Sequence, residues 1–183
     1  YILALGRIQS DNNIEMLLEA FKGTNKKFVY IGNWNVSNYS KFLLNKYSKF
    51  SNLILLDAIY DLETLDIIRS NCKYYLHAHS AGGTNPSLVE AMHYKIPILC
   101  YDNTFNNYTT KDKSFYFKNK EQLLLHLNYL DFNPKLSLKI ANDLYLIAQE
   151  FYTWKSISTK YFNFIIKSII FGLLCATSTS YPD

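Results

Sequence analysis

Short apolar runs alternate with amphipathic stretches along this chain. The runs lack polar alternation, which is typical of strands covered on both faces of a sheet. Between them, apolar residues recur at helical spacing. The runs predict strands at 1–5, 28–31, 53–56, 96–101 and 114–117, and one that begins at Tyr74.

Helix start signals agree with this alternation. Asn12 and Glu15 form a capping-box pattern, Asp61 and Asn85 are predicted N-caps, and Pro86 suits the first position of a helix. After the fifth strand, polar residues are expected either to contact a ligand or to belong to an ordinary loop; they are Asn106, Thr109 and Thr110. The predicted helices cover 12–22, 39–50, 61–70, 121–130 and 134–151, with further helices from Asn85 and after Trp154.

Strands and helices in this order predict an α/β fold with a doubly wound, mostly parallel sheet of the Rossmann-like kind. In that fold the sheet order reverses between the first and fourth strands, and ligands bind at the carboxyl ends of these strands. One of these ends carries Gly6 and Arg7, and the other carries residues 77–84. The sequence therefore predicts a site where two segments distant in the chain meet.

The segment after the fourth strand has the pattern of an anion-binding helix start. Glycines let a ligand approach the backbone, and a helix N-terminus offers free N–H groups, so the pattern suits a phosphate. A tight turn without a ligand is the alternative, and hydroxyl residues cap many helices. The residues expected to contact the phosphate are Gly82, Gly83, Thr84, Asn85 and Ser87.

Arg7 and Glu90 are the charged candidates. Arg7 is one of two arginines in the chain, and a guanidinium offers a fork of donors to phosphate oxygens. A surface ion pair is the alternative for Arg7. Glu90 lies one turn into its helix, where it can reach back to vicinal hydroxyls such as those of a ribose. Its apolar neighbours predict a mostly buried helix, and a role at the helix dipole is the alternative.

Composition limits the remaining choices. The chain has 183 residues, 49% of them hydrophobic, which suits one domain, and its charge of +4 is spread without a basic block. This argues against a nucleic-acid partner and leaves attraction to anionic lipid open. Cys72, Cys100 and Cys175 are expected to be reduced thiols in a cytoplasmic protein. Because a strand begins directly at Tyr1, an N-terminal domain of the same polypeptide is expected to precede it.

The C-terminal segment is apolar from 162 to 176 except at Asn163, Lys167 and Ser168. It is too short for a membrane span, which needs about 20 apolar residues. Packing on a neighbouring domain or contact with a membrane surface is expected instead. The chain is thus divided into a domain at 1–164 and an apolar helix with a disordered tail at 165–183.

Two strings carry a resemblance to a known family. They are DNNIE at 11–15 and the long, specific HAHSAGGTNPSLVEAM at 77–92. With Gly6, Arg7 and Glu90, they make the chain resemble the C-terminal, donor-binding domain of a GT-B glycosyltransferase of glycosyltransferase family 4, in its bacterial rhamnosyltransferase-like subgroup. The resemblance covers about 1–164.

This resemblance implies transfer of a sugar, such as rhamnose or another hexose, from a nucleotide-sugar to a saccharide or lipid-linked acceptor. Such enzymes build capsule or lipopolysaccharide at the inner face of the bacterial membrane, with retention and without a metal, so no cofactor is expected. Two positions depart from the family pattern. Gly82 replaces its first glutamate, and Asn12 replaces the lysine that partners the arginine on the diphosphate.

The resemblance also suggests individual contacts. The loop at Ile59 and Tyr60 lies where family members hold the base. Either His77 or His79 could bind phosphate or donor-sugar hydroxyls. His77 and His79 alone fall short of a zinc site, which needs at least a third ligand. Asn12 is expected to be a helix cap first and a phosphate contact second.

Arg7 and the loop amides are expected to neutralise the leaving diphosphate, while Glu90 anchors the ribose. The acceptor side would come from the N-terminal domain, so this piece alone is expected to bind nucleotide with little turnover. Two other readings are open: a noncatalytic nucleotide-binding module, and a sugar-nucleotide epimerase or hydrolase on the same fold. An oxidoreductase is disfavoured because no Gly-x-Gly-x-x-Gly follows a strand.

Overall fold

The computed structural model describes residues 1–177, with side chains described as far as Ile170. A 6-stranded parallel sheet has the order β3-β2-β1-β4-β5-β6. The predicted doubly wound, Rossmann-like fold is confirmed. The strands are β1 (Ile2–Leu5), β2 (Phe28–Ile31), β3 (Leu53–Leu56), β4 (Tyr74–His77), β5 (Ile98–Tyr101) and β6 (Phe115–Phe117).

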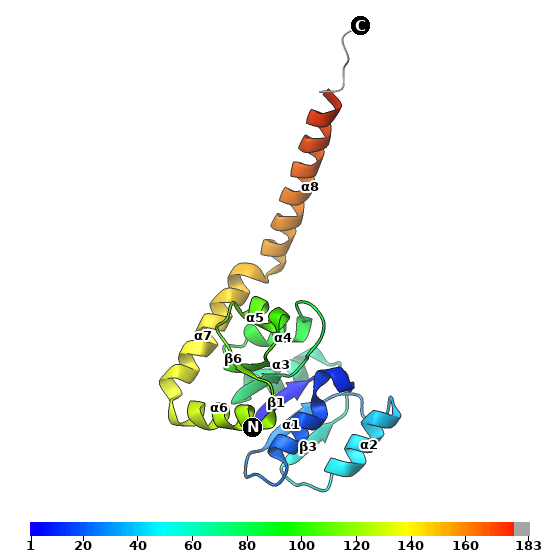
Figure 1. Cartoon of the computed structure of the whole chain (residues 1–183), viewed down its shortest axis with the longest axis vertical. Coiled ribbons are helices and arrows are strands. Elements are labelled where there is room, and N and C mark those ends of the chain that lie inside the picture. Colours follow the sequence, from blue (N-terminus) through cyan, green and yellow to red (C-terminus); the bar gives the residue numbers. More distant parts are fainter. Residues whose placement is uncertain (178–183) are drawn as a thin grey trace.

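Helices enclose this sheet (Figure 1). Helix α1 packs beside α6, and α4 packs beside α7. A short 3₁₀ helix, η1 (Ser10–Asn12), precedes the first α-helix. The α-helices are α1 (Ile14–Phe21), α2 (Asn38–Tyr47), α3 (Leu62–Ser70), α4 (Pro86–Met92), α5 (Thr104–Thr110), α6 (Lys120–Phe132), α7 (Pro134–Phe151) and α8 (Trp154–Thr177).

The order in which strands are added to the sheet reverses between β1 and β4, which are neighbours. Ile2 lies opposite Tyr74 and Leu3 opposite Tyr75. All four residues of β2 and of β4 are buried, as expected for strands covered on both faces. The carboxyl ends of β1 and β4 therefore lie side by side, as the sequence predicts.

The predicted capping box at Asn12 is wrong. Asn12 belongs to η1, and Asn13 is the N-cap of α1, with φ 51° and no hydrogen bond from its side chain to the helix. The Glu15 carboxylate pairs with Lys46 Nζ at 2.8 Å instead of returning to the helix start. The extra turn of η1 moves the helix start by one residue, which frees Asn12 for another contact.

Helix α5 was missed because its polar sequence, TFNNYTT, has no apolar period. Its start is capped by Asn103, whose Oδ1 accepts a hydrogen bond from the N–H of Asn106 at 2.8 Å. Asn106, Thr109 and Thr110 are buried, and each of these polar side chains has hydrogen-bond partners. The buried face of α5 therefore consists of hydrogen-bonded polar side chains, so the helix lacks the apolar periodicity by which helices are recognised in a sequence.

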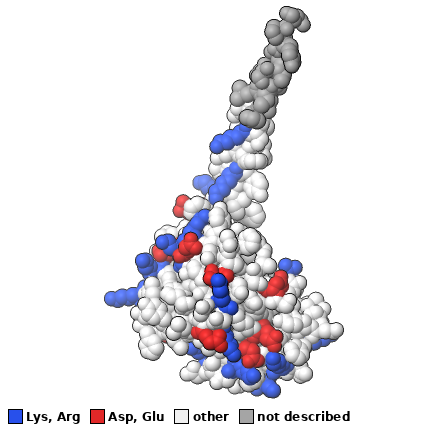
Figure 2. Space-filling model, viewed as in Figure 1, with Lys and Arg blue, Asp and Glu red and all other residues white. Residues whose placement is uncertain are grey.

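Helix α8 projects away from the sheet and its helices (Figure 1). Its described side chains include exposed aromatic and aliphatic residues, and its charged residues up to Ile170 are all lysines (Figure 2). No helix in the described part of the chain is both long enough and apolar enough to cross a membrane. The predicted domain boundary at 164 falls inside α8 and stays a prediction, and the predicted disordered tail beyond Thr177 lies outside the described residues.

Candidate functional site

The loops that follow β1 and β4 are bound directly to each other. The backbone N–H and the Oγ of Ser80 both donate to the carbonyl oxygen of Asp11, at 2.8 and 2.7 Å. Asn13 Nδ2 donates to the carbonyl oxygen of Ala78 at 2.9 Å. These bonds fix the two segments that the sequence places at one site.

Gly6 leaves room for the His79 side chain between these loops. Its φ is +156°, and a Cβ built at this position would lie 3.2 Å from Cε1 of the His79 ring. A larger residue would be strained and would displace His79. The glycine at the end of β1 is therefore needed for the side chain that follows β4.

His77 and His79 stack on each other, with ring centroids 4.3 Å apart. His77 is 1% exposed, and neither of its ring nitrogens has a hydrogen-bond partner among the described residues. Burial lowers the pKa of His77 well below its usual value, and the nearby His79 lowers it further. Burial also lowers the pKa of His79, which Asp11 partly opposes and the positive charge of Arg7 reinforces. Both rings are therefore neutral at pH 7.

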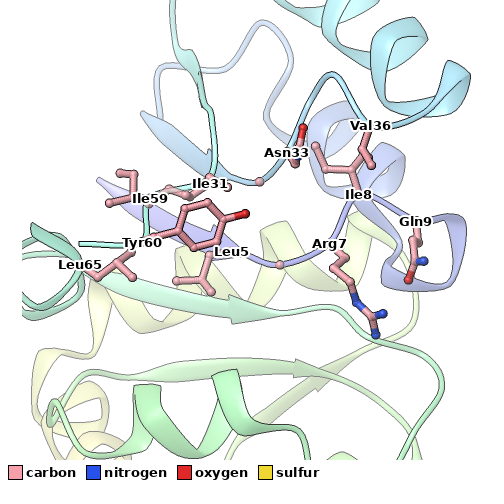
Figure 3. Close-up of a pocket in the computed structure, with 13 residues that line it drawn as sticks. Leu5, Arg7, Ile8, Gln9, Ile31, Asn33, Val36, Ile59, Tyr60 and Leu65 are labelled. Atoms are coloured by element: carbon pink, nitrogen blue, oxygen red, sulfur yellow. The ribbon is translucent and has the colours of Figure 1, made fainter. Parts of the chain in front are cut away.

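Arg7 is exposed and forms no ion pair with any residue that the structure describes. Its guanidinium points toward the segment after β4 (Figure 3), in agreement with its effect on the pKa of His79. The ion-pair alternative for Arg7 has no partner here. A cationic fork without an acid at the carboxyl end of β1 is available to an anionic ligand.

A cavity of about 450 Å³ opens beside Arg7. Tyr60, 84% exposed, lies at one end of it beside Leu5 and Ile59, with Arg7 at the other end (Figure 3). The loop predicted to hold a base and the arginine predicted to hold a diphosphate therefore share one cavity. Its lining residues are Leu5, Gly6, Arg7, Ile8, Gln9, Ile31, Gly32, Asn33, Val36, Ala58, Ile59, Tyr60 and Leu65.

Asn12 holds the backbone of Arg7 at the border of this cavity. Its side chain is 6% exposed, and its Nδ2 donates to the carbonyl oxygen of Arg7 at 2.6 Å. The residue therefore fixes the backbone that carries the guanidinium. A direct contact between Asn12 and a phosphate stays a prediction.

The start of α4 has the predicted cap. Asn85 Oδ1 accepts hydrogen bonds from the backbone N–H and the Oγ of Ser87, at 3.0 and 2.8 Å. Gly82, Gly83 and Thr84 are exposed, and a Cβ built at either glycine would contact nothing within 4 Å. The backbone here is open to a ligand, although none of these residues lines the cavity beside Arg7.

Thr84 and Glu90 line a second cavity, of about 580 Å³, between α4 and the beginning of α8. Glu90 is exposed on a helix whose other face is buried, because α4 turns this residue outward while Leu88, Ala91 and Met92 face the core. The structure thus joins Gly6, Arg7, Asn12, Tyr60 and His79, and it places Thr84 and Glu90 in an adjoining region of α4. The second cavity is lined by Thr84, Pro86, Val89, Glu90, His93, Tyr152, Thr153, Trp154 and Ile157.

Arg69 is a charged residue of this region that the sequence interpretation missed. It lies near the end of α3 and is 7% exposed, and its Nη2 is 2.6 Å from Glu90 Oε2. The signal was present in the sequence, because Arg69 is the other of the two arginines in a chain that otherwise uses lysine. The argument applied to Arg7 would have found it.

The second missed group holds the loop after β4 in place. Nδ2 of Asn103 and Nδ2 of Asn106 both donate to the carbonyl oxygen of His79, at 2.9 and 3.1 Å. These residues belong to the start of α5, which the sequence pattern did not reveal. No group of three or more His, Cys, Asp or Glu residues in the described part of the chain could hold a metal ion.

Residues 1–143 match the family described as "Glycosyl transferases group 1". The chain belongs to this family. The resemblance to a GT-B glycosyltransferase is confirmed at this level. A search among curated proteins found no relative.

Solved structures of glycosyltransferases share the fold of this group 1 chain. Sucrose-phosphate synthase from Thermosynechococcus elongatus aligns over 92% of the chain with a TM-score of 0.78 and 14% identity. HepE from Anabaena, solved in complex with UDP-glucose, aligns over 91% with a TM-score of 0.78 and 14% identity. The chain covers 45% of the first protein and 49% of the second, so it spans about half of their length.

A third structure matches the size of this chain. It is the C-terminal domain of LpcC, a group 1 glycosyl transferase from Francisella tularensis, with a TM-score of 0.67 and 17% identity. The match covers 84% of this chain and 87% of that one. A domain of this size has thus been solved by itself in the same family.

Proposed function

We propose that this chain is the donor-binding half of a glycosyltransferase that moves a sugar, rhamnose or another hexose, from a nucleotide-sugar to a saccharide or lipid-linked acceptor. The observation that carries the proposal is the unpaired Arg7 at the carboxyl end of β1, in one cavity with the Tyr60 loop. The chain's family supports the reaction class, and the complex of HepE with UDP-glucose supports a nucleotide-sugar as ligand. The rhamnosyltransferase-like subgroup belongs to the proposal.

The nucleotide would lie along the carboxyl ends of the strands. The backbone near Tyr60 would hold the base, Arg7 and neutral His79 would bind the diphosphate, and Glu90 would accept hydrogen bonds from the ribose. Gly6 admits His79, and Asn12 fixes the carbonyl of Arg7. Amides of the segment before α4 would complete the phosphate contacts, from Gly82, Gly83, Thr84, Asn85 and Ser87.

Charge stabilisation would carry the reaction. The bond between the anomeric carbon and the diphosphate oxygen breaks, and its electron pair stays on the leaving diphosphate. The Arg7 guanidinium and the backbone N–H groups stabilise that growing charge in place of a metal ion. The acceptor oxygen then bonds to the anomeric carbon, and its proton passes to a base outside this chain.

The acceptor-binding site and the base that takes the acceptor proton would belong to an N-terminal domain of the same polypeptide, because the chain spans about half of the related enzymes. The isolated chain should therefore bind nucleotide with little or no turnover. Bacterial surface polysaccharide, such as capsule or lipopolysaccharide, is the proposed product. Lys155, Lys160 and Lys167 on α8, beside exposed apolar side chains, support contact with an anionic membrane at its cytoplasmic face.

Calorimetric titration tests the proposal. UDP, TDP and GDP, with their sugars, are added to the unaltered chain and to Arg7→Ala, with Lys139→Ala as a control that removes an exposed cation from α7. Binding that Arg7→Ala weakens and Lys139→Ala leaves unchanged supports the assignment. Absence of binding by the unaltered chain, or equal binding by all three proteins, contradicts it.

A noncatalytic nucleotide-binding module is the second candidate. It is favoured by Gly82, which leaves open space where the family pattern has a glutamate. Such a module would bind nucleotide through Arg7 in the same way. Sugar transfer by the complete polypeptide, measured as nucleotide release that depends on an acceptor, distinguishes the two candidates.

A further inference from the structure

Arg69 and Glu90 form an ion pair between two helices with unequal surroundings. The Arg69 side chain is 8% exposed and the Glu90 side chain is 51% exposed, with 2.6 Å between Nη2 and Oε2. Arg69 comes from α3 and Glu90 from α4. The buried partner is therefore the fixed one, and the exposed partner is held at the surface by it.

The Arg69 guanidinium pairs with one carboxylate, that of Glu90. Asp66, which lies near, is engaged by the hydroxyl of Tyr94, and the Tyr94 ring centroid is 6.0 Å from Arg69 Cζ. Among the residues described, Arg69 makes no other ion pair, and its Nε has no hydrogen-bond partner. A buried cation with a single anion strongly favours the geometry in which the two meet.

This pairing uses one oxygen of Glu90. Oε2 accepts from Arg69, whereas Oε1 has no hydrogen-bond partner in the part of the chain that is described. An exposed glutamate without such a partner would sample several rotamers and would lose that freedom on binding a ligand. A carboxylate already held in one orientation binds with a smaller loss of entropy.

We propose that Arg69 is a positioning residue, which orients Glu90 so that its free oxygen accepts a hydrogen bond from a ribose hydroxyl of the bound nucleotide. The inference rests on the proposed function, because it needs a nucleotide at this site. The competing explanation is that the pair only joins α3 to α4. The two explanations differ in what they predict for ligands that lack a hydroxyl.

The test compares UDP and GDP with their 2′-deoxy and 3′-deoxy forms by calorimetry. The unaltered chain should bind a ribonucleotide about tenfold more tightly than at least one deoxy form, the effect of one hydrogen bond to a charged group. Arg69→Met and Glu90→Gln should each reduce this ratio to about twofold or less, with similar affinity for the deoxy form. The double variant should show no further loss of the ratio.

A pair that only joins the helices would lower both affinities together and keep their ratio, which overturns the inference. Arg69→Lys keeps the charge but loses the fork, so it should fold even if Arg69→Met does not, and it should lose part of the ratio. A chain that binds UDP or GDP but does not distinguish the deoxy forms overturns the roles of Arg69 and Glu90 at the ribose and leaves the proposed donor binding at Arg7 standing. A chain that binds neither overturns both.

Discussion

The amino ends and the carboxyl ends of the strands use charged groups in opposite ways. At the amino ends of the strands, Asp131 accepts hydrogen bonds from Lys26, Lys73 and Tyr74, at 2.6, 2.6 and 2.9 Å. Burial opposes ionisation of Asp131, but these three donors outweigh it and lower its pKa to about 2. Every charge in this network has a partner within the chain.

At the carboxyl ends, charged and polar groups lack partners. Arg7 forms no ion pair, and His77 is buried without a hydrogen bond, among the residues that the structure describes. A buried polar group without a partner, such as His77, reduces stability, whereas the exposed Arg7 stays solvated and is free to bind an anion. The amino ends of the strands therefore use their charges for stability, and the carboxyl ends keep theirs available for binding.

Arg7→Ala should have the largest effect on binding. The proposed contact of its fork with a diphosphate involves charge-assisted hydrogen bonds, so affinity for UDP should fall by about 100-fold. The melting temperature should stay unchanged, because the Arg7 guanidinium has no ion-pair partner to lose among the described residues. Calorimetry and thermal melting measure the two quantities. A lower melting temperature with unchanged affinity would place Arg7 among the stabilising residues and break the comparison.

Asp131→Asn should give the reverse result. It leaves Lys26 and Lys73 without their shared anion, so the free energy of unfolding at pH 7 should fall by ~2 kcal/mol, with UDP affinity unchanged. The pKa of Asp131 is lower in the folded chain than its ordinary 3.8, so its contribution is present above about pH 4 and is lost as the pH falls toward 2. Denaturant unfolding at pH 7 and at pH 2.5 measures this. A difference between variant and unaltered chain that is as large at pH 2.5 as at pH 7 would contradict the assignment.

His77 should show a different pH window. Its folded pKa is lowered by burial, so the unfolded chain takes up a proton first, below about pH 6.5. Stability should therefore fall by ~1.4 kcal/mol for each pH unit below that value, until the folded state also binds the proton. His77→Phe removes the titrating ring and keeps a buried aromatic group. Its unfolding free energy should depend less on pH between 7 and 5, and an unchanged slope would exclude His77 as the cause.

The sequence predicts the fold well because the strands are continuous apolar runs and the connections are short. It also predicts the meeting of Gly6 and Arg7 with the segment after β4, since the doubly wound topology alone requires it. It could not predict α5, whose buried face is polar, or the η1 turn that moves the start of α1 past Asn12. Both depend on hydrogen bonds between residues distant in the chain, such as those from Asn106 to His79.

The site shows the same division. The topology places Arg7 and Tyr60 near each other, because they come after β1 and β3, whose carboxyl ends lie on the same side of the sheet. The orientation of Glu90 does not, since it depends on Arg69 of another helix. Periodicity places a residue on its own helix but carries no information about a partner on the next one. A rare residue type can point to such a partner, but only if every residue of that type is considered. Of the two arginines, the sequence interpretation considered Arg7 and not Arg69.

Asn12→Ala should have the smallest effect. It tests whether a residue at the carboxyl ends of the strands can serve both binding and stability. Its Nδ2 holds the carbonyl oxygen of Arg7, so its loss frees the backbone below the guanidinium without removing the charge. UDP affinity should fall by about fivefold, and the free energy of unfolding should fall by ~1 kcal/mol, the value of one neutral hydrogen bond. Asn12→Asp is the matched variant, because it keeps the shape but turns a donor toward Arg7 into an acceptor. If Asn12 acts through Arg7, neither substitution should weaken UDP binding further in an Arg7→Ala background, whereas a direct phosphate contact would make the two losses add.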